Sequence, residues 1–237
     1  IYLLWTDVRD ERTLRACAQI GERLDAAYAS RYGVGPRGTP RTGIVLFARL
    51  ADYRSFVQAD GRLSAGYAGF ASAADGLVYL HGSDPRARTI STLAHELTHL
   101  VEGRAFPRGL PPWLSEGMAE GIGQSAREEG LLPLASTPPD EASLRRLRDA
   151  YRSNEAGDLG RLFRASRSEF DRGVRSFDYE ESALLVRFLA SDARYAARFR
   201  AELARLAAGE RYQAERFLVR ERADLARDFE SWLRGRR

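Results

Sequence analysis

The sequence has no lysine, a single cysteine, a single asparagine and three histidines among its 237 residues. One cysteine, Cys17, excludes any disulfide within the chain. Cys17 falls on one face of a helical pattern with Leu14, Leu24 and Tyr28. We therefore expect a buried thiol without a reactive role.

The chain also lacks a long apolar run and any block of like charge. No segment approaches the roughly 18 consecutive apolar residues that a membrane-spanning helix needs. The formal charge of +4 comes from 37 basic residues interleaved with 33 acidic ones, a pattern typical of solvated helix faces rather than of a nucleic-acid interface. A hydrophobic content of 44% and this length suit one substantial core or two small lobes.

The most informative stretch is the apolar helical pattern over residues 92–101, T-L-A-H-E-L-T-H-L-V. Residues i and i+4 of a helix project from the same face, so His95 and His99 are placed to bind one metal ion. Glu96 lies beside them, where it can hold a water at the metal and accept its proton, as in the H-E-x-x-H motif. The sequence therefore predicts a metal centre on this helix.

The surroundings of the motif favour a half-buried helix over a loop. Apolar residues follow helical spacing at positions 90, 93, 97, 100 and 101. Asp84 and Pro85 predict the start of the helix, and Gly103 predicts its end. A chance occurrence of the motif is the alternative, and this context argues against it.

A catalytic zinc ion needs a third protein ligand and one open position. The metzincin continuation is excluded, because Glu102 stands where that class requires glycine and Ala105 where it requires histidine. The spacing of His81, in a strand-like run upstream, does not recommend it as a ligand. Two alternatives remain for His81: contact with substrate near the cleft, or an ordinary solvated position on the surface.

A second helix is predicted after Pro111 and Pro112, with the sequence W-L-S-E-G-M-A-E-G. Glu116 and Glu120 lie at i and i+4 on one face of it. The glycines at positions 117, 121 and 123 weaken the helix by about 1 kcal/mol each relative to alanine. We expect them to allow a close approach of this helix to the H-E-x-x-H helix.

The motifs H-E-x-x-H and W-L-x-E-G-x-A-E together resemble the gluzincin branch of zinc metallopeptidases, in particular the bacterial proteins described as peptidase MA-like. The resemblance covers residues 92–121 and implies a zincin-like fold, with His95, His99 and Glu116 as zinc ligands and Glu96 as general base. It also implies that Glu120 receives a hydrogen bond from the imidazole of His95. A metal-bound histidine usually needs such an anchor for its other ring nitrogen.

Tyr179 begins a further helical segment, Y-E-E-S-A-L-L-V-R-F-L. The segment resembles the tyrosine-led helix that peptidase MA-like proteins place after the W-L-x-E-G-x-A-E helix, which implies a catalytic role for Tyr179 as a hydrogen-bond donor to the oxyanion. The alternative is an amphipathic residue at a helix start, with a buried ring and a solvated hydroxyl.

Strand-like patterns occupy the first third of the chain and helical patterns the remainder. We expect the following elements: strand 2–7, helix 10–32, linker 33–43, buried strand 44–48, short helix 52–58, a hairpin of 67–71 with 77–81, and helices from about 141 onward. This order predicts an α+β fold, with a small N-terminal mixed sheet packed on the H-E-x-x-H helix and a mostly helical C-terminal lobe. The domain prediction is a single catalytic domain over 1–237, with an N-terminal lobe over 1–105 and a helical lobe over 106–237.

The function implied by these residues is zinc-dependent hydrolysis of internal bonds in a peptide or protein substrate. In gluzincins an edge strand beside the metal-binding helix pairs with an extended peptide, and the resemblance assigns this role to Leu77–His81; a hairpin that only caps the core is the alternative. Two other functions stay open: a zincin-fold binding protein without activity, and a zinc amidase acting on a non-protein amide. The resemblance also implies an extracytoplasmic location, and the arginine-rich composition is typical of a GC-rich bacterial genome.

Overall fold

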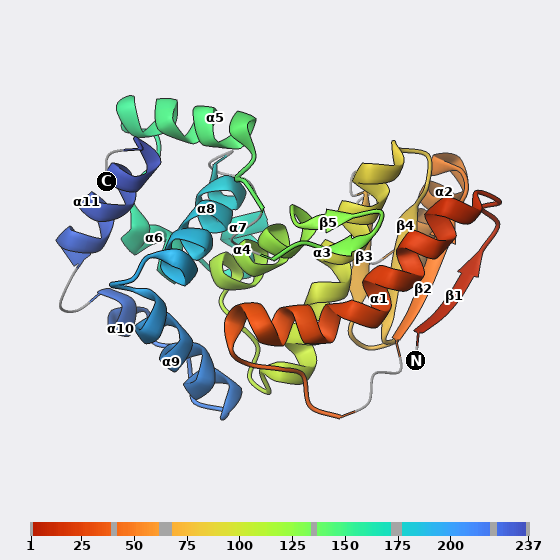
Figure 1. The fold of residues 1–237 in the computed structure, drawn as a ribbon, viewed down its shortest axis with the longest axis horizontal. Coiled ribbons are helices and arrows are strands. Elements are labelled where there is room, and N and C mark those ends of the chain that lie inside the picture. Colours follow the sequence, from red (N-terminus) through yellow and green to blue (C-terminus); the bar gives the residue numbers. More distant parts are fainter. Residues whose placement is uncertain are drawn as a thin grey trace. The chain divides into compact units, whose positions relative to one another are not determined.

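The computed structural model describes residues 2–38, 42–61, 68–133, 137–171, 177–218 and 222–235. These residues form an α+β structure with two compact units (Figure 1). The first unit comprises Ile1–Arg31, Gly35–Ala105 and Ile122–Pro133, and the second comprises Tyr32–Val34, Phe106–Gly121 and Leu134–Arg237. The α+β fold class predicted from the sequence is confirmed.

The first unit is built on a four-stranded sheet with the strand order β1-β2-β4-β3. Strands β1, β2 and β4 are parallel, and β3 is antiparallel to β4, so the predicted small mixed sheet is confirmed. The elements of this unit are β1 (Tyr2–Thr6), α1 (Glu11–Tyr32, its last residue in the second unit), β2 (Thr42–Phe47), α2 (Leu50–Asp60), β3 (Gly69–Ser72), β4 (Leu77–His81), α3 (Arg86–Ala105), β5 (Ala126–Arg127) and β6 (Gly130–Leu131).

The hairpin expected before the H-E-x-x-H helix is present, but its second strand is not the edge strand that the resemblance implied. Strand β4 pairs with β2 on one side and β3 on the other, so the prediction that Leu77–His81 is an edge strand is wrong. The chain runs from β2 through α2 to β3 and then to β4, and β4 lies between β2 and β3. The hairpin partner β3 is therefore one of the two edge strands of the described sheet, and β1 is the other.

Helices α2 and α3 pack on opposite faces of this sheet. Successive side chains of a strand alternate between the two faces, so neighbouring strand residues contact different helices. On one face, Tyr53 and Val57 of α2 form a core cluster with Phe70 and Tyr79. On the other face, a Cβ at Gly69 would lie 3.0 Å from Thr92 Cγ2 of α3 and 3.1 Å from the Cβ of Leu80. The absence of a side chain at Gly69 therefore lets β3 approach the H-E-x-x-H helix closely.

An ion pair links helix α1 to the carboxyl end of α3. The guanidinium of Arg104 donates hydrogen bonds of 2.8 and 3.2 Å to the carboxylate of Asp25. Cys17 of α1 is 0% exposed, and burial raises the pKa of its thiol to about 12. The prediction of a buried thiol is confirmed, and this pKa keeps it protonated at neutral pH.

The second unit is helical over the residues that the structure describes. Its elements are α4 (Pro112–Gly123, with Ile122 and Gly123 in the first unit), α5 (Glu141–Arg152), α6 (Leu159–Arg164), α7 (Arg167–Asp171), α8 (Asp178–Ser191), α9 (Ala196–Ala207), α10 (Ala214–Leu218) and α11 (Arg222–Leu233). The apolar stripe predicted on α8 is buried, with Leu185 at 0% and Phe188 at 1% exposure. Across the described ranges, no helix has both the length and the apolar character needed to cross a bilayer.

Candidate metal centre

Helix α3 carries the H-E-x-x-H motif on its one partly open face. His95, Glu96 and His99 are half-buried. Leu93 and Leu97, on the opposite side of the same turns, are at most 1% exposed. The apolar spacing read from the sequence therefore fixes the rotation of α3, and that rotation leaves the motif side chains accessible.

The two histidines are brought together as their spacing predicts. His95 Nε2 and His99 Nε2 lie 3.2 Å apart, with ring centroids at 4.9 Å and ring planes at 78°. Two nitrogens bound to one tetrahedral zinc ion at about 2.0–2.1 Å would lie about 3.3 Å apart. The separation of the imidazoles thus fits a shared ion.

The other ring nitrogen of His99 has a partner that the sequence analysis missed. His99 Nδ1 lies 3.4 Å from Oε2 of Glu102, a residue that is only 5% exposed. Glu102 follows His99 by three residues on the same helix, so this i,i+3 spacing was a signal available in the sequence.

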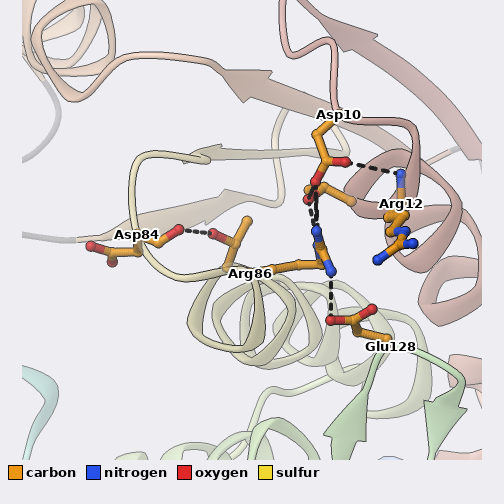
Figure 2. Close-up of polar contacts among 7 residues, drawn as sticks. Asp10, Arg12, Asp84, Arg86 and Glu128 are labelled. Carbon is orange, nitrogen blue, oxygen red and sulfur yellow. Dashed lines mark hydrogen bonds and ion pairs between the residues drawn. The ribbon is translucent and has the colours of Figure 1, made fainter.

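The amino end of α3 is fixed by Arg86, as Figure 2 shows. The guanidinium of Arg86 donates to Asp10 Oδ2 at 3.1 and 3.2 Å and to Glu128 Oε1 at 2.8 Å. It also donates to Thr13 Oγ1 at 3.2 Å. Together with the Arg104–Asp25 pair, these contacts hold α3 at both ends, so the motif lies on a restrained helix.

The sequence predicted that α3 ends at Gly103. The helix instead continues to Ala105. Nothing lies within 4 Å of a Cβ built at Gly103. Ala105 is 1% exposed, and Arg104 pairs with Asp25. Burial and pairing of these last two residues stabilise a further half-turn, which outweighs the weak helix propensity of glycine.

His81 is 6% exposed, so the alternative of a solvated surface position is wrong. Its ring centroid lies 5.4 Å from that of Tyr53, and burial is the largest cause that lowers its pKa. Burial, followed by the negative charge of Glu96, raises the pKa of Tyr53 to about 12. His81 Nδ1 and the Tyr53 hydroxyl are buried without a hydrogen-bond partner among the described residues.

Glu116 lies in α4 of the second unit and is 5% exposed. Arg167 Nη1 of α7 donates a hydrogen bond to its Oε1 at 2.5 Å. The two residues are 51 positions apart, so no sequence pattern pointed to Arg167. Within this unit the carboxylate is thus both buried and oriented by a cation.

Buried and partly buried hydrogen bonds hold the helix that carries Glu116. Trp113 is 0% exposed, and its Nε1 donates to the hydroxyl of Tyr212 at 3.0 Å. That hydroxyl donates in turn to the carbonyl of Phe163 at 3.1 Å. The Tyr32 hydroxyl donates to the carbonyl of Met118 at 3.1 Å. The tryptophan of the W-L-x-E-G-x-A-E motif therefore anchors α4 in its own unit.

The three glycines of α4 make three different close approaches. A Cβ at Gly117 would lie 2.5 Å from the carbonyl oxygen of Ser182 in α8, and one at Gly121 would lie 3.2 Å from the Tyr32 hydroxyl. A Cβ at Gly123 would lie 3.0 Å from the Ser91 carbonyl oxygen. The expected approach to the H-E-x-x-H helix is therefore confirmed for Gly123 and wrong for the other two glycines, which face other neighbours.

Two further predicted site residues lie in the second unit. Glu120 of α4 is half-buried. Tyr179 is the second residue of α8, as the sequence predicted, and its ring makes an edge contact with Phe170 at a centroid distance of 4.8 Å. Its ring is only partly buried. The roles of Glu120 and Tyr179 stay predictions.

Comparison with protein-family models finds no match to this chain, and neither does comparison with curated protein sequences. The chemistry and the geometry of the residues described above are therefore the basis for assigning a function.

Proposed function

We propose that the protein is a zinc-dependent hydrolase of peptide bonds with a zincin-like fold, similar to the gluzincins. Its zinc ligands are His95, His99 and Glu116, and its general base is Glu96. The observation that carries the proposal is the 3.2 Å separation of the two Nε2 atoms on α3.

The ligand chemistry supports this proposal. The proposed ligands are the imidazoles of His95 and His99, on α3, and the carboxylate of Glu116, on α4. Two imidazoles and one carboxylate are the donor set of several catalytic zinc sites, which keep a fourth position open. Hard cations such as Mg²⁺ and Ca²⁺ prefer sites made of oxygen ligands alone, so this set favours zinc.

The residues of the chain divide the chemical work. His95, His99 and Glu116 would hold a zinc ion, whose Lewis-acid chemistry would lower the pKa of a bound water to about 7 and polarise the scissile carbonyl. Glu96 accepts the proton of the attacking water and passes it to the leaving amine. Tyr179 donates a hydrogen bond to the carbonyl oxygen as negative charge develops on it.

The substrate in this proposal is an extended peptide that adds to the edge strand of the sheet that lies beside α3. Strand β3 takes this role in place of β4, because β4 pairs on both sides. Backbone pairing of this kind holds a peptide with little selection for its sequence. Gly69 brings β3 close to Thr92, which lies one helical turn before Glu96.

The deciding experiment measures zinc and activity together. Protein purified without added metal or a metal-capturing tag is assayed for zinc by elemental analysis and for cleavage of denatured casein. We expect one zinc per chain in the wild type and in Glu96→Gln, and its loss in His99→Ala. Glu96→Gln should cleave about two to four orders of magnitude more slowly, because glutamine cannot accept the proton.

Glu22→Gln is the matched control, because it makes the same change at an exposed position of α1. It should retain both zinc and activity. Full cleavage by Glu96→Gln would contradict the assignment of the base. Zinc without cleavage of casein or of a peptide library in the wild type would instead favour the binding-protein or amidase interpretation.

A further inference from the structure

The contact between His99 and Glu102 is a feature of α3 that the proposed mechanism does not use. His99 Nδ1 and Glu102 Oε2 are 3.4 Å apart, and the Glu102 side chain is 7% exposed. The neighbouring Val101 and Ala105 are each 1% exposed. Glu102 thus places a buried carboxyl group beside a ring nitrogen of a proposed metal ligand.

A buried carboxylate needs hydrogen-bond donors in place of the water that it loses on folding. A ring N–H of His99 can supply one such donor to Glu102.

The hydrogen-bond chemistry of the imidazole determines which ring nitrogen of His99 donates to Glu102. A neutral imidazole has one N–H, and its other nitrogen carries a lone pair. Because a carboxylate only accepts, Glu102 selects the form of His99 in which Nδ1 carries the proton. The lone pair is then on Nε2, the nitrogen that lies 3.2 Å from His95 Nε2.

We propose that Glu102 is a positioning residue that holds His99 in its Nδ1–H tautomer, with Nε2 presented as a metal ligand. The metal-binding consequence rests on the proposed function, whereas the tautomer does not. Carboxylate partners of this kind orient the ring and strengthen the ligand nitrogen, and their loss typically weakens metal binding about 10- to 100-fold. The proposed ligand and the residue that orients it lie on the same helix, so α3 needs no other element to orient His99.

The first measurement is the tautomer of His99 in the metal-free protein. Two-bond ¹⁵N–¹H correlation spectra at pH 8, where imidazoles are neutral, distinguish Nδ1–H from Nε2–H. We expect Nδ1–H in the wild type and a shift toward Nε2–H in Glu102→Ala. A wild-type His99 in the Nε2–H form would overturn the proposal without any metal present.

The second measurement is the zinc affinity, determined by competition with a chromophoric chelator. We expect affinity to fall about 10- to 100-fold in Glu102→Ala and by less in Glu102→Gln, whose amide oxygen still accepts a hydrogen bond. Glu22→Gln, exposed on α1, should bind zinc as the wild type does.

The outcomes of the two measurements separate this inference from the proposed function. Equal zinc affinities of the wild type and Glu102→Ala would overturn the positioning role and leave the zinc site standing. A wild type that binds no zinc would overturn the proposed function, while the tautomer would still test the role of Glu102. Glu102→Gln conserves volume, so it keeps the comparison available if Glu102→Ala does not fold.

Discussion

Arg167 Nη1 donates a 2.5 Å hydrogen bond to Glu116 Oε1 within the second unit. The Glu116 side chain is 6% exposed, whereas that of Arg167 is 49% exposed. The guanidinium compensates for the burial of the carboxylate and restricts its rotation. Both effects prepare Glu116 to act as a ligand, because hydrogen-bonded carboxylates lose less freedom when they bind a metal.

Replacing Arg167 with alanine should therefore weaken zinc binding about 10- to 100-fold, the usual effect of losing a hydrogen-bond partner of a ligand. A chelator competition assay measures the change. Arg145→Ala, at an exposed position of α5, is the matched control and should leave the affinity unchanged. Equal affinities of Arg167→Ala and Arg145→Ala would show that Glu116 does not depend on this contact.

Replacements of the two glutamates of α4 should differ in kind. Glu116→Ala removes a proposed ligand and should abolish stoichiometric zinc binding. Glu120→Ala removes only the proposed anchor of His95, and should weaken binding about 10- to 100-fold. The two zinc dissociation constants decide the matter, and the reverse order would mean that the roles of the two carboxylates are exchanged.

Tyr179→Phe tests the oxyanion donor. The substitution removes one hydroxyl and keeps the ring that contacts Phe170, so the fold should persist. A donor role predicts a lower kcat with zinc content and KM little changed. Tyr195→Phe is the control, because it removes a hydroxyl that donates to Asp228 elsewhere in the same unit. Identical kcat values for the wild type and Tyr179→Phe would show that the Tyr179 hydroxyl has no part in catalysis and that its ring serves only in packing.

Tyr53→Phe should stabilise the protein. The Tyr53 hydroxyl is buried without a hydrogen-bond partner among the described residues, and such a group costs about 1–3 kcal/mol. Removing it should raise the free energy of unfolding in urea by about 1 kcal/mol.

Tyr151→Phe provides the contrast to Tyr53→Phe. Its hydroxyl donates to Glu181 Oε1 at 2.7 Å, so this substitution should destabilise the protein. A loss of stability in Tyr53→Phe would show that its hydroxyl is hydrogen-bonded in solution.

We expect the stability of the protein to depend on pH through the buried carboxyl group of Glu181. Burial raises its pKa above the ordinary 4.5, against hydrogen bonds from Tyr151 and Gly157 that lower it. The folded state then keeps a proton that the unfolded state has lost, so this group's contribution to stability falls as pH rises from about 4.5 through the folded pKa.

Glu181→Gln cannot ionise and should remove that contribution. The variant should therefore gain stability relative to the wild type between pH 4 and pH 8, as measured by urea unfolding at both values. Glu141→Gln, exposed on α5, is the control. A stability difference that stays constant between the two pH values would show that Glu181 does not titrate in this range.

The local parts of the candidate centre were determined by the sequence alone. Helical geometry places His95 and His99 on one face whatever surrounds them, and the apolar spacing around them predicted which face is buried. The same local rules predicted the hairpin and the other two strands of the four-stranded sheet, because turn residues and alternation act over a few positions. Glu102 belongs to this class as well, since its contact with His99 spans three residues.

Only the tertiary structure decided the features that depend on distant residues. The strand order places β3 rather than β4 at an edge of the sheet. The parallel pairing of β2 with β4 joins distant segments, so no local pattern predicts it. The partner of Glu116 and the neighbours of Gly117 and Gly121 come from segments more than 50 residues away. Close packing selects such contacts from the whole chain at once, so residue spacing does not reveal them.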